Sequence, residues 1–392
     1  MLFSNWFPFF VTTRSQILHF IRLYGRKVNV PSLILLLVVG GAAGCGHLQH
    51  KAAPDMVYVS ARGSLYLHDR VAVVSNRVAE VENGEALQVI EQAGRFLRVK
   101  TGKGQVGWIE QSAVVDHTIY DQFAQLAAAH KDDPVVAKGT LDDELYMHIL
   151  PGRATQHFYL IPASTKVDLL ARASAPKTAV QNVIQAAKPA QAVPGLPQSQ
   201  PVAMEDWWLA RDSRGRTGWL LGSRVYVNVT DDIAQYAEGQ QIVGAYILRK
   251  VEDPESDFPN HQAPEYVTLE APLSAGRPFD FNEVRVFTWS VRHHRYETAF
   301  RLRPIAGFLP LRTGTETGPK GAEVPTFSFV IADNDNVVTD PGTGITKPAS
   351  PRTIRYEMID TVVKRIGPDM APVPLLDHGK RKEDVRKRRR RR

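Results

Sequence analysis

A stretch of 14 residues occurs twice in this chain. The first copy, residues 96–109, reads FLRVKTGKGQVGWI, and the second, residues 207–220, reads WWLARDSRGRTGWL. The two copies align without a gap on their Gly-Trp pairs. Each combines a strand that begins with an aromatic residue, a polar turn that contains glycine, and a second strand that contains Gly-Trp. This is the pattern of a β-hairpin. A duplicated hairpin predicts a chain that is built from repeated units.

The repeat continues beyond the hairpin. Residues 65–68 (LYLH) match residues 145–148 (LYMH) at an offset of 80, whereas the hairpins are 111 residues apart. The second unit therefore contains 31 additional residues, at about 174–204, whose Ala-, Pro- and Gln-rich composition predicts a solvated, disordered insertion. Helix-start patterns at Thr118 and Thr230 follow the two hairpins. Each unit thus predicts a small antiparallel barrel followed by a short helix.

The positive charge of the chain is concentrated at its two ends. The net charge is +7, but residues 380–392 carry +8 and residues 1–44 carry +4, which leaves −5 for the rest. A mildly acidic body argues against a nucleic-acid-binding face. The chain ends in five arginines, Arg388, Arg389, Arg390, Arg391 and Arg392. Such a block repels itself and stays disordered, and we expect it to contact an anionic membrane surface or envelope polymer. A nucleic-acid tail and a solubilising end are the alternatives.

An apolar run at residues 33–45 ends in small residues and in the only cysteine of the chain, Cys45. The run is shorter than the roughly 20 residues of a membrane span. Because Arg26 and Lys27 precede it, it predicts a secretory signal peptide over residues 1–44. The sequence Ala-Ala-Gly-Cys at its end resembles the bacterial lipobox, and this resemblance implies that Cys45 is lipidated and anchors the mature protein. The alternative is an uncleaved anchor with an incidental cysteine.

Residues 55–116 and 134–229 resemble bacterial SH3 (SH3b-like) domains, whose last strands carry an aromatic residue, a Gly-bearing turn and Gly-Trp. The order of lipobox, two such units, a β-rich region and a basic tail also resembles that of SH3 domain-containing bacterial lipoproteins. The resemblance implies binding to peptidoglycan or cell-wall peptides in the envelope.

Residues 240–370 are predicted to form a third, β-rich domain. Strand-like segments such as residues 283–291 and 325–331 alternate there with Gly- and Pro-rich turns. We expect an antiparallel sandwich or an open barrel. The predicted fold class is therefore mainly β, with two small SH3-like barrels, short linking helices and this domain. The other boundaries that we assign are a linker at 45–54, a helix at 117–133, a short helix at 230–239 and a basic disordered tail at 371–392.

Aromatic residues of the two hairpins are the candidate ligand contacts. They are Trp207, Trp208, Trp219, Phe96 and Trp108. Such residues more often build the wall of a small barrel than contact a ligand. Trp207 and Trp208 are adjacent on a strand, so they point to opposite faces and one of them is expected to be exposed. The tryptophan pair occurs only in the second unit, which is therefore the expected binding unit, and Trp208→Ala is expected to weaken binding without unfolding.

The sequence does not predict an enzyme, a cofactor or a metal site. Residues 102–107 satisfy the dinucleotide pattern G-x-G-x-x-G, but a strand rather than a helix is predicted to follow. His293 and His294 would point to opposite faces of a strand, which disfavours a shared metal ion. His68 and His148 recur at equivalent positions of the duplicated unit, which we interpret as a structural role. A catalytic thiol is not expected, because Cys45 would be lipidated.

Together these features support the hypothesis of a non-enzymatic, lipid-anchored envelope protein on the periplasmic side of a membrane, with the outer membrane preferred. Its expected partners are peptidoglycan or envelope proteins, bound through the SH3b-like units, and not nucleic acid. Two alternatives stay open. One is a structural or assembly lipoprotein that contacts envelope proteins through the C-terminal β-domain, and the other is a cell-wall-modifying enzyme.

Overall fold

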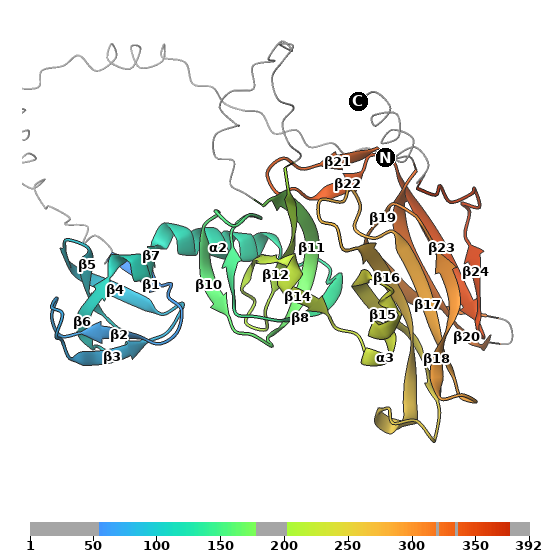
Figure 1. The fold of residues 1–392 in the computed structure, drawn as a ribbon, viewed down its shortest axis with the longest axis horizontal. Helices are drawn as coiled ribbons and strands as arrows, with labels where there is room; N and C mark the ends of the chain where they lie inside the picture. Colours follow the sequence, from blue (N-terminus) through green and yellow to red (C-terminus); the bar gives the residue numbers. More distant parts are fainter. Residues whose placement is uncertain (1–54, 178–201, 319–320, 334–335, 377–392) are drawn as a thin grey trace, which may run out of the picture. The chain divides into compact units, whose positions relative to one another are not determined.

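The structure is a computed structural model, and it describes residues 55–177, 202–318, 321–333 and 336–376. This part of the chain is mainly β, with antiparallel sheets and a few short helices, as the sequence predicts (Figure 1). None of its helices is long and apolar enough to span a membrane. Cys45, the assigned signal peptide and linker, residues 178–201 of the insertion and the five terminal arginines lie outside the described residues. The expectations for these segments stay predictions.

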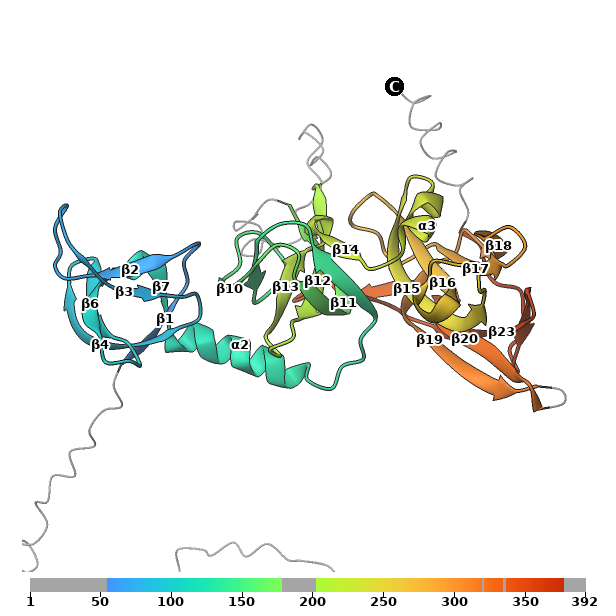
Figure 2. The ribbon, with the colours of Figure 1, turned by 90° about the horizontal axis from the view of Figure 1, so that it is seen from below.

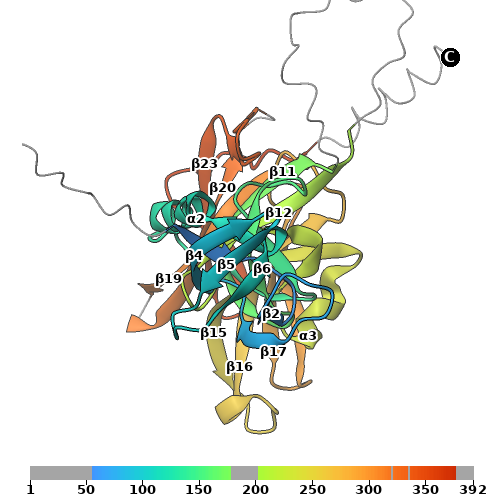
Figure 3. The same ribbon diagram turned by 90° about the vertical axis from the view of Figure 1, so that its left-hand side faces the viewer.

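A seven-stranded antiparallel sheet forms the first unit, in the order β3-β2-β6-β5-β4-β1-β7. β6, β5 and β4 lie side by side (Figure 1, Figure 3). The strands are β1 (Met56–Val59), β2 (Leu65–His68), β3 (Arg77–Val81), β4 (Ala86–Ala93), β5 (Phe96–Lys100), β6 (Val106–Glu110) and β7 (Val114–Asp116). Val59, Leu67, Val99 and Ile109, from four of these strands, are buried in one core, so the sheet curls around it. The edge strands β3 and β7 do not pair with each other in the described chain, so the predicted barrel is open rather than closed.

The second unit repeats this sheet strand for strand. Its order, β10-β9-β13-β12-β11-β8-β14, places each strand where its counterpart lies in the first unit. The strands are β8 (Ala137–Leu141), β9 (Leu145–His148), β10 (His157–Ile161), β11 (Lys166–Pro176), β12 (Met204–Arg211), β13 (Thr217–Leu221) and β14 (Val225–Val227). β11 and β12 stay paired as far as Pro176 and Met204. The ends of the segment assigned to an insertion at 174–204 are therefore strand, because they continue the ladder of the hairpin.

Short helices follow both units. α2 (His117–Ala129) joins the first unit to the second (Figure 2), and α3 (Asp231–Ala234) continues into the 3-10 helix η4 (Gln235–Ala237). The carboxylate of Asp116 accepts a hydrogen bond from the Ile119 amide at 3.1 Å and caps α2. α2 therefore begins before Thr118, where the sequence pattern had placed the cap. Phe123 of α2 is buried in the core of the second unit.

Side chains of the first unit contact the residues that follow it. The amide of Asn83, in the turn between β3 and β4, donates to the Phe158 carbonyl at 3.2 Å, and its oxygen accepts from the Leu160 amide at 3.0 Å. The Phe158 carbonyl and the Leu160 amide lie where the pairing register between β9 and β10 shifts. The ring of Tyr58 stacks on that of Tyr120 in α2, with centroids 4.1 Å apart.

The glycine of each Gly-Trp pair lies against the neighbouring strand, and the contact is the same in both units. A Cβ on Gly107 would lie 2.7 Å from the Leu67 Cβ, and a Cβ on Gly218 would lie 2.6 Å from the Met147 Cβ. Leu67 and Met147 occupy equivalent positions of β2 and β9. Because side chains essentially never approach this closely, only glycine fits the observed strand spacing.

The C-terminal region is a sandwich of two four-stranded antiparallel sheets, with the orders β15-β16-β17-β18 and β19-β20-β23-β24. The first contains β15 (Gln240–Glu252), β16 (Gln262–Pro272), β17 (Glu283–Ser290) and β18 (Arg295–Leu302). The second contains β19 (Gly307–Thr317), β20 (Glu323–Ala332), β23 (Pro351–Ile359) and β24 (Val362–Ile366), and β21 (Val337–Thr339) pairs separately with β22 (Thr346–Pro348). Val267 and Val286 of one sheet are buried in the same cluster as Phe327 and Ile354 of the other. Of the two predicted architectures, the sandwich is the one observed.

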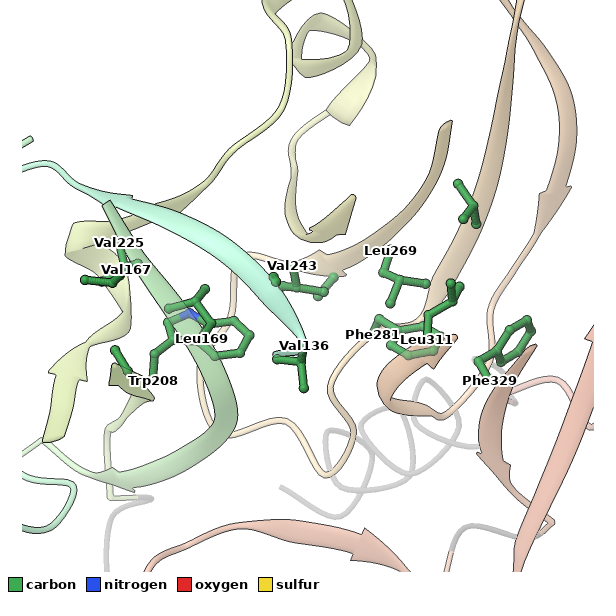
Figure 4. Close-up of a cluster of buried hydrophobic side chains, with 14 of the residues drawn as sticks. Val136, Val167, Leu169, Trp208, Val225, Val243, Leu269, Phe281, Leu311 and Phe329 are labelled. Carbon is green, nitrogen blue, oxygen red and sulfur yellow. The ribbon is translucent and has the colours of Figure 1, made fainter. Parts of the chain in front are cut away.

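The second unit and the sandwich share one hydrophobic core (Figure 4). Val136 and Trp208 of the second unit belong to the same buried cluster as Leu269 and Phe329 of the sandwich. The hydroxyl of Tyr246 in β15 donates to the Val136 carbonyl, and burial raises the pKa of this phenol. The second unit and the sandwich therefore do not have separate cores, whereas the first unit has a core of its own.

Buried ions lie beside this shared core. The guanidinium of Arg172 contacts Asp206 at 2.8 Å and Asp280 at 3.4 Å, and Arg277 contacts Asp206 at 3.1 Å. Burial raises the pKa of the Asp280 carboxyl, and the nearby Arg172 opposes that effect. Removing one member of such a buried cluster would leave an uncompensated charge, which is strongly destabilising.

We predict that Gly107→Ala lowers the free energy of unfolding by about 1–3 kcal/mol, because its Cβ must displace β2. The matched control is Gly102→Ala in the turn of the same hairpin, where a Cβ would meet no atom within 4 Å. Urea unfolding of the full chain in detergent, followed by tryptophan fluorescence, measures the difference. Equal stabilities of the two variants would contradict the packing role of Gly107.

Candidate binding grooves

An open groove lies on the outer face of the first unit, between β2, the β2–β3 loop and the β5–β6 hairpin. Its volume is about 520 Å³. Aromatic and apolar side chains line much of it, among them Tyr66, Val71, Val73, Phe96 and Trp108. Val71 is 45% exposed and Val73 is fully exposed, so the loop presents apolar surface at the mouth of the groove. Exposed apolar surface at a groove is typical of a ligand-binding site.

Strand alternation builds the wall of this groove. Leu67 enters the core, so its neighbours Tyr66 and His68 face outward. The register sets His68 opposite Trp108 on β6. The His68 ring is fixed by Ser75, with 2.9 Å between Nδ1 and Oγ, and this bond also closes the β2–β3 loop.

An equivalent groove of about 350 Å³ lies on the second unit. The counterparts are, pair by pair, Tyr66 and Tyr146, His68 and His148, Phe96 and Trp207, and Ser75 and Thr155. The Nδ1 atom of His148 lies 3.0 Å from the Thr155 hydroxyl, so the loop closure is repeated too. The sequence interpretation of the two histidines as purely structural therefore missed that they line grooves. Their recurrence in the same four-residue strand of each unit was the available signal.

Trp207 and Trp208 are both buried, contrary to the prediction that one of them is exposed. Their side chains are 2% and 5% exposed. They do point to opposite faces of β12, but Trp208 packs in the shared core and Trp207 packs with Trp219 and Leu170 in a second cluster. Ile345, distant in sequence, packs against that second cluster. Trp208→Ala would therefore open a cavity in the core, and it cannot test binding alone.

Phe96 and Trp108 are the two predicted contact residues that remain half-exposed. Of the predicted contact residues, those with accessible rings thus line the groove of the first unit, whereas the sequence favoured the second. Arg77 lies over the Tyr66 ring at 4.1 Å and Arg95 over the Phe96 ring at 5.3 Å. These cations hold the rings of the groove in place.

Basic and neutral polar groups surround the second groove. Arg62, between β1 and β2, lies over the Tyr146 ring at 5.3 Å, and Arg153 is bound through two hydrogen bonds of 2.8 Å to Glu205. Burial, reinforced by the nearby His157, lowers the pKa of His148 to about 4, so its ring is neutral at pH 7. Among the residues that the structure describes, no acidic side chain lines this groove.

The other patterns singled out in the sequence lie in a hairpin turn and in ion pairs. Residues 102–107 lie in the β5–β6 turn and its return strand, so no helix follows the glycines. His293 pairs with Glu297 at 3.1 Å and His294 with Asp253 at 2.9 Å. Within the described ranges, no group of three or more His, Cys, Asp or Glu side chains could hold a metal ion.

No family model and no curated protein matches the chain. Among solved structures, NlpC2 from Trichomonas vaginalis is 10% identical, and the match covers 62% of this chain and 92% of that chain with a TM-score of 0.15. NlpC1 from the same organism is 10% identical, with 63% and 87% covered and a TM-score of 0.14. Because both TM-scores are far below 0.5, these likenesses assign neither a fold family nor a function to the chain.

We predict that His148 makes stability depend on pH between about 6.5 and 4. Its folded-state pKa of about 4 lies below the ordinary 6.5, so the unfolded chain takes up the proton first. Stability is then complete above pH 6.5 and declines as the pH falls towards 4. His148→Asn, which keeps a polar group near Thr155, should flatten this decline in thermal unfolding, and histidine ring NMR should give the pKa directly. A His148 ring that titrates near 6.5 would refute the neutral, buried state.

Proposed function

We propose that this protein is a non-enzymatic, lipid-anchored protein of the cell envelope that binds peptidoglycan or an envelope protein in the grooves of its two units. The observation that carries the proposal is the recurrence of one groove, with the same tyrosine and histidine positions, on both units. The envelope location rests on the resemblance of residues 42–45 to a lipobox and of the units to SH3b-like domains.

The first groove supports a binding role most directly. Half-exposed Tyr66, Phe96 and Trp108 offer flat apolar faces on a rigid sheet, and Val71 and Val73 extend this surface along a loop. Aromatic rings with few rotatable bonds gain contact area at low entropic cost, which suits peptide or sugar ligands. Two grooves on one chain would also raise the strength of binding to a repetitive polymer through effective concentration.

The hydroxyl–histidine pairs of the grooves favour binding over catalysis. A nucleophilic hydroxyl needs to face the substrate while a base withdraws its proton. The Thr155 hydroxyl instead lies 2.7 Å from the Leu150 carbonyl and 2.8 Å from the Gly152 carbonyl, inside its own loop. Because the single hydroxyl proton is directed to these carbonyls, the His148 Nδ1–H donates to the Thr155 oxygen and closes the loop, and it does not withdraw a proton from a nucleophile.

We predict that Val73→Asp lowers binding of the full-length protein, in detergent, to insoluble peptidoglycan by about tenfold, because a charge replaces apolar contact area. Val73 is fully exposed, so the fold should not change. The matched control is Val338→Asp on β21, where valine is 61% exposed and lines neither groove. The measurement is retention on the sedimented polymer, with thermal unfolding as the check of folding.

The same assay separates the competing functions. Absence of retention of the unchanged protein would remove the wall-binding claim. Crosslinking that recovers envelope proteins but no glycan, and that Val73→Asp leaves intact, would favour an assembly role of the C-terminal sandwich.

A further inference from the structure

We propose that a pocket of the C-terminal sandwich binds the guanidinium group of an arginine side chain, held against its aromatic rings with Asp232 and Asp257 as counter-ions. The pocket has a volume of about 320 Å³ and lies between α3, η4, the loop that follows β15 and the β17–β18 hairpin. It is separate from the grooves of the two units, so the inference goes beyond the proposed function and does not depend on it.

Aromatic rings form the apolar part of this pocket. Tyr236, Phe258 and Trp289 line it and are only half-buried. The rings of Phe258 and Trp289 meet edge to face, with centroids 5.2 Å apart and an angle of 85° between their planes. Trp289 meets Tyr296 in the same way at 5.0 Å. The face of an aromatic ring attracts a cation, and among protein side chains arginine is the more frequent partner.

A buried carboxylate holds these rings in place. The Asp253 side chain is 1% exposed, and it accepts hydrogen bonds from the Trp289 indole at 2.7 Å and from Nδ1 of His294 at 2.9 Å. The Tyr236 hydroxyl donates to the Tyr296 carbonyl at 3.2 Å. The rings are therefore positioned before a ligand arrives, which lowers the entropic cost of binding.

The cationic side chains of the pocket are already paired. His294 lies 2.9 Å from Asp253 and 3.2 Å from Glu255, so two carboxylates balance its ring. Arg295 is largely exposed and lies 3.6 Å from Glu297. Neither residue therefore supplies an uncompensated positive charge to the pocket.

Two carboxylates of the pocket have no counter-ion. Asp232 in α3 and Asp257 in the loop after β15 are exposed and line the pocket, and neither forms an ion pair within the described part of the chain. A planar guanidinium can stack on a ring and bind a carboxylate in its own plane, whereas a compact ammonium group is more strongly hydrated. The pocket is therefore better suited to arginine than to lysine.

Two sources can supply the arginine: the five arginines at the end of this chain, or a partner protein. The Leu376 amide donates to the Pro304 carbonyl at 2.8 Å, just after the end of β18, and Arg295 at the other end of β18 lines the pocket. The nine residues from Arg295 to Pro304 span at most about 30 Å, whereas the 12 residues from Leu376 to Arg388 can reach about 40 Å. The arginines of the same chain are thus within reach of the pocket.

The experiment follows the indole N–H signal of Trp289 in the full-length protein, in detergent and with 15N-labelled tryptophan, at pH 7. Trp289→Phe assigns the signal. The probes are acetyl-arginine amide, acetyl-lysine amide and acetyl-citrulline amide, which has nearly the shape of the arginine probe but no charge. The arginine probe should shift the signal and bind about tenfold more tightly than the citrulline probe, because only the cation gains the ion pair and the ring attraction. The lysine probe should bind more weakly than the arginine probe.

The double variant Asp232→Asn, Asp257→Asn should weaken binding of the arginine probe about tenfold, because both counter-ions are lost. The matched control is Glu323→Gln, which removes an exposed carboxylate of β20 outside the pocket and should leave the affinity unchanged. Thermal unfolding checks that both variants are folded.

Removal of residues 380–392 distinguishes the two sources. If the arginines of the same chain occupy the pocket, this removal shifts the Trp289 signal and raises the affinity for the arginine probe. If a partner protein supplies the arginine, the signal and the affinity stay unchanged. The inference would be overturned by equal binding of the arginine and citrulline probes, by tighter binding of the lysine probe, by an unchanged affinity in the double variant, or by a Trp289 signal that responds in neither the full-length nor the shortened protein.

Discussion

The close approach of two glycines to a neighbouring strand is the constraint on which both repeated units depend. Gly107 and Gly218 leave room for the side chains of Leu67 and Met147 to enter the core, and the strands meet in one register. That register determines which side chains face outward beside the tryptophan that follows each glycine. The same strand pairing therefore positions the core side chains on one face of the sheet and the groove side chains on the other. Replacing the glycine would disturb both.

Duplication preserved this pairing while the surroundings of the two units diverged. In the first unit the outer face stays accessible and forms the groove of larger volume. In the second, residues as distant as Ile345 cover part of that face, and the other face of the unit joins the core of the sandwich. The same sheet thus serves as an independent small domain in one place and as part of a larger hydrophobic body in the other.

The local features of this fold could be predicted from the sequence, because hairpins, strand alternation and repeats depend on neighbours in the chain. The two hairpins and the mainly β class belong to this group, whereas for the C-terminal region the sequence left both a sandwich and an open barrel open. The burial of Trp207 and Trp208 could not be predicted, since it depends on which distant residues cover each face of β12. The grooves were missed for a related reason: His68 and His148 looked structural, and only the folded loops show that they are both structural and accessible to a ligand.

The contact of Asn83 with β10 has a consequence for how the protein ages. Asn83 precedes Gly84, and an Asn-Gly pair is the sequence in which the side-chain amide is lost most readily to give aspartate, one form of the heat lability of asparagine. In the closed contact the amide nitrogen donates to the Phe158 carbonyl. An aspartate there would set a negatively charged oxygen against that carbonyl and could no longer donate. The conversion is irreversible. Loss of the Asn83 amide would therefore permanently remove this hydrogen bond between the first unit and β10.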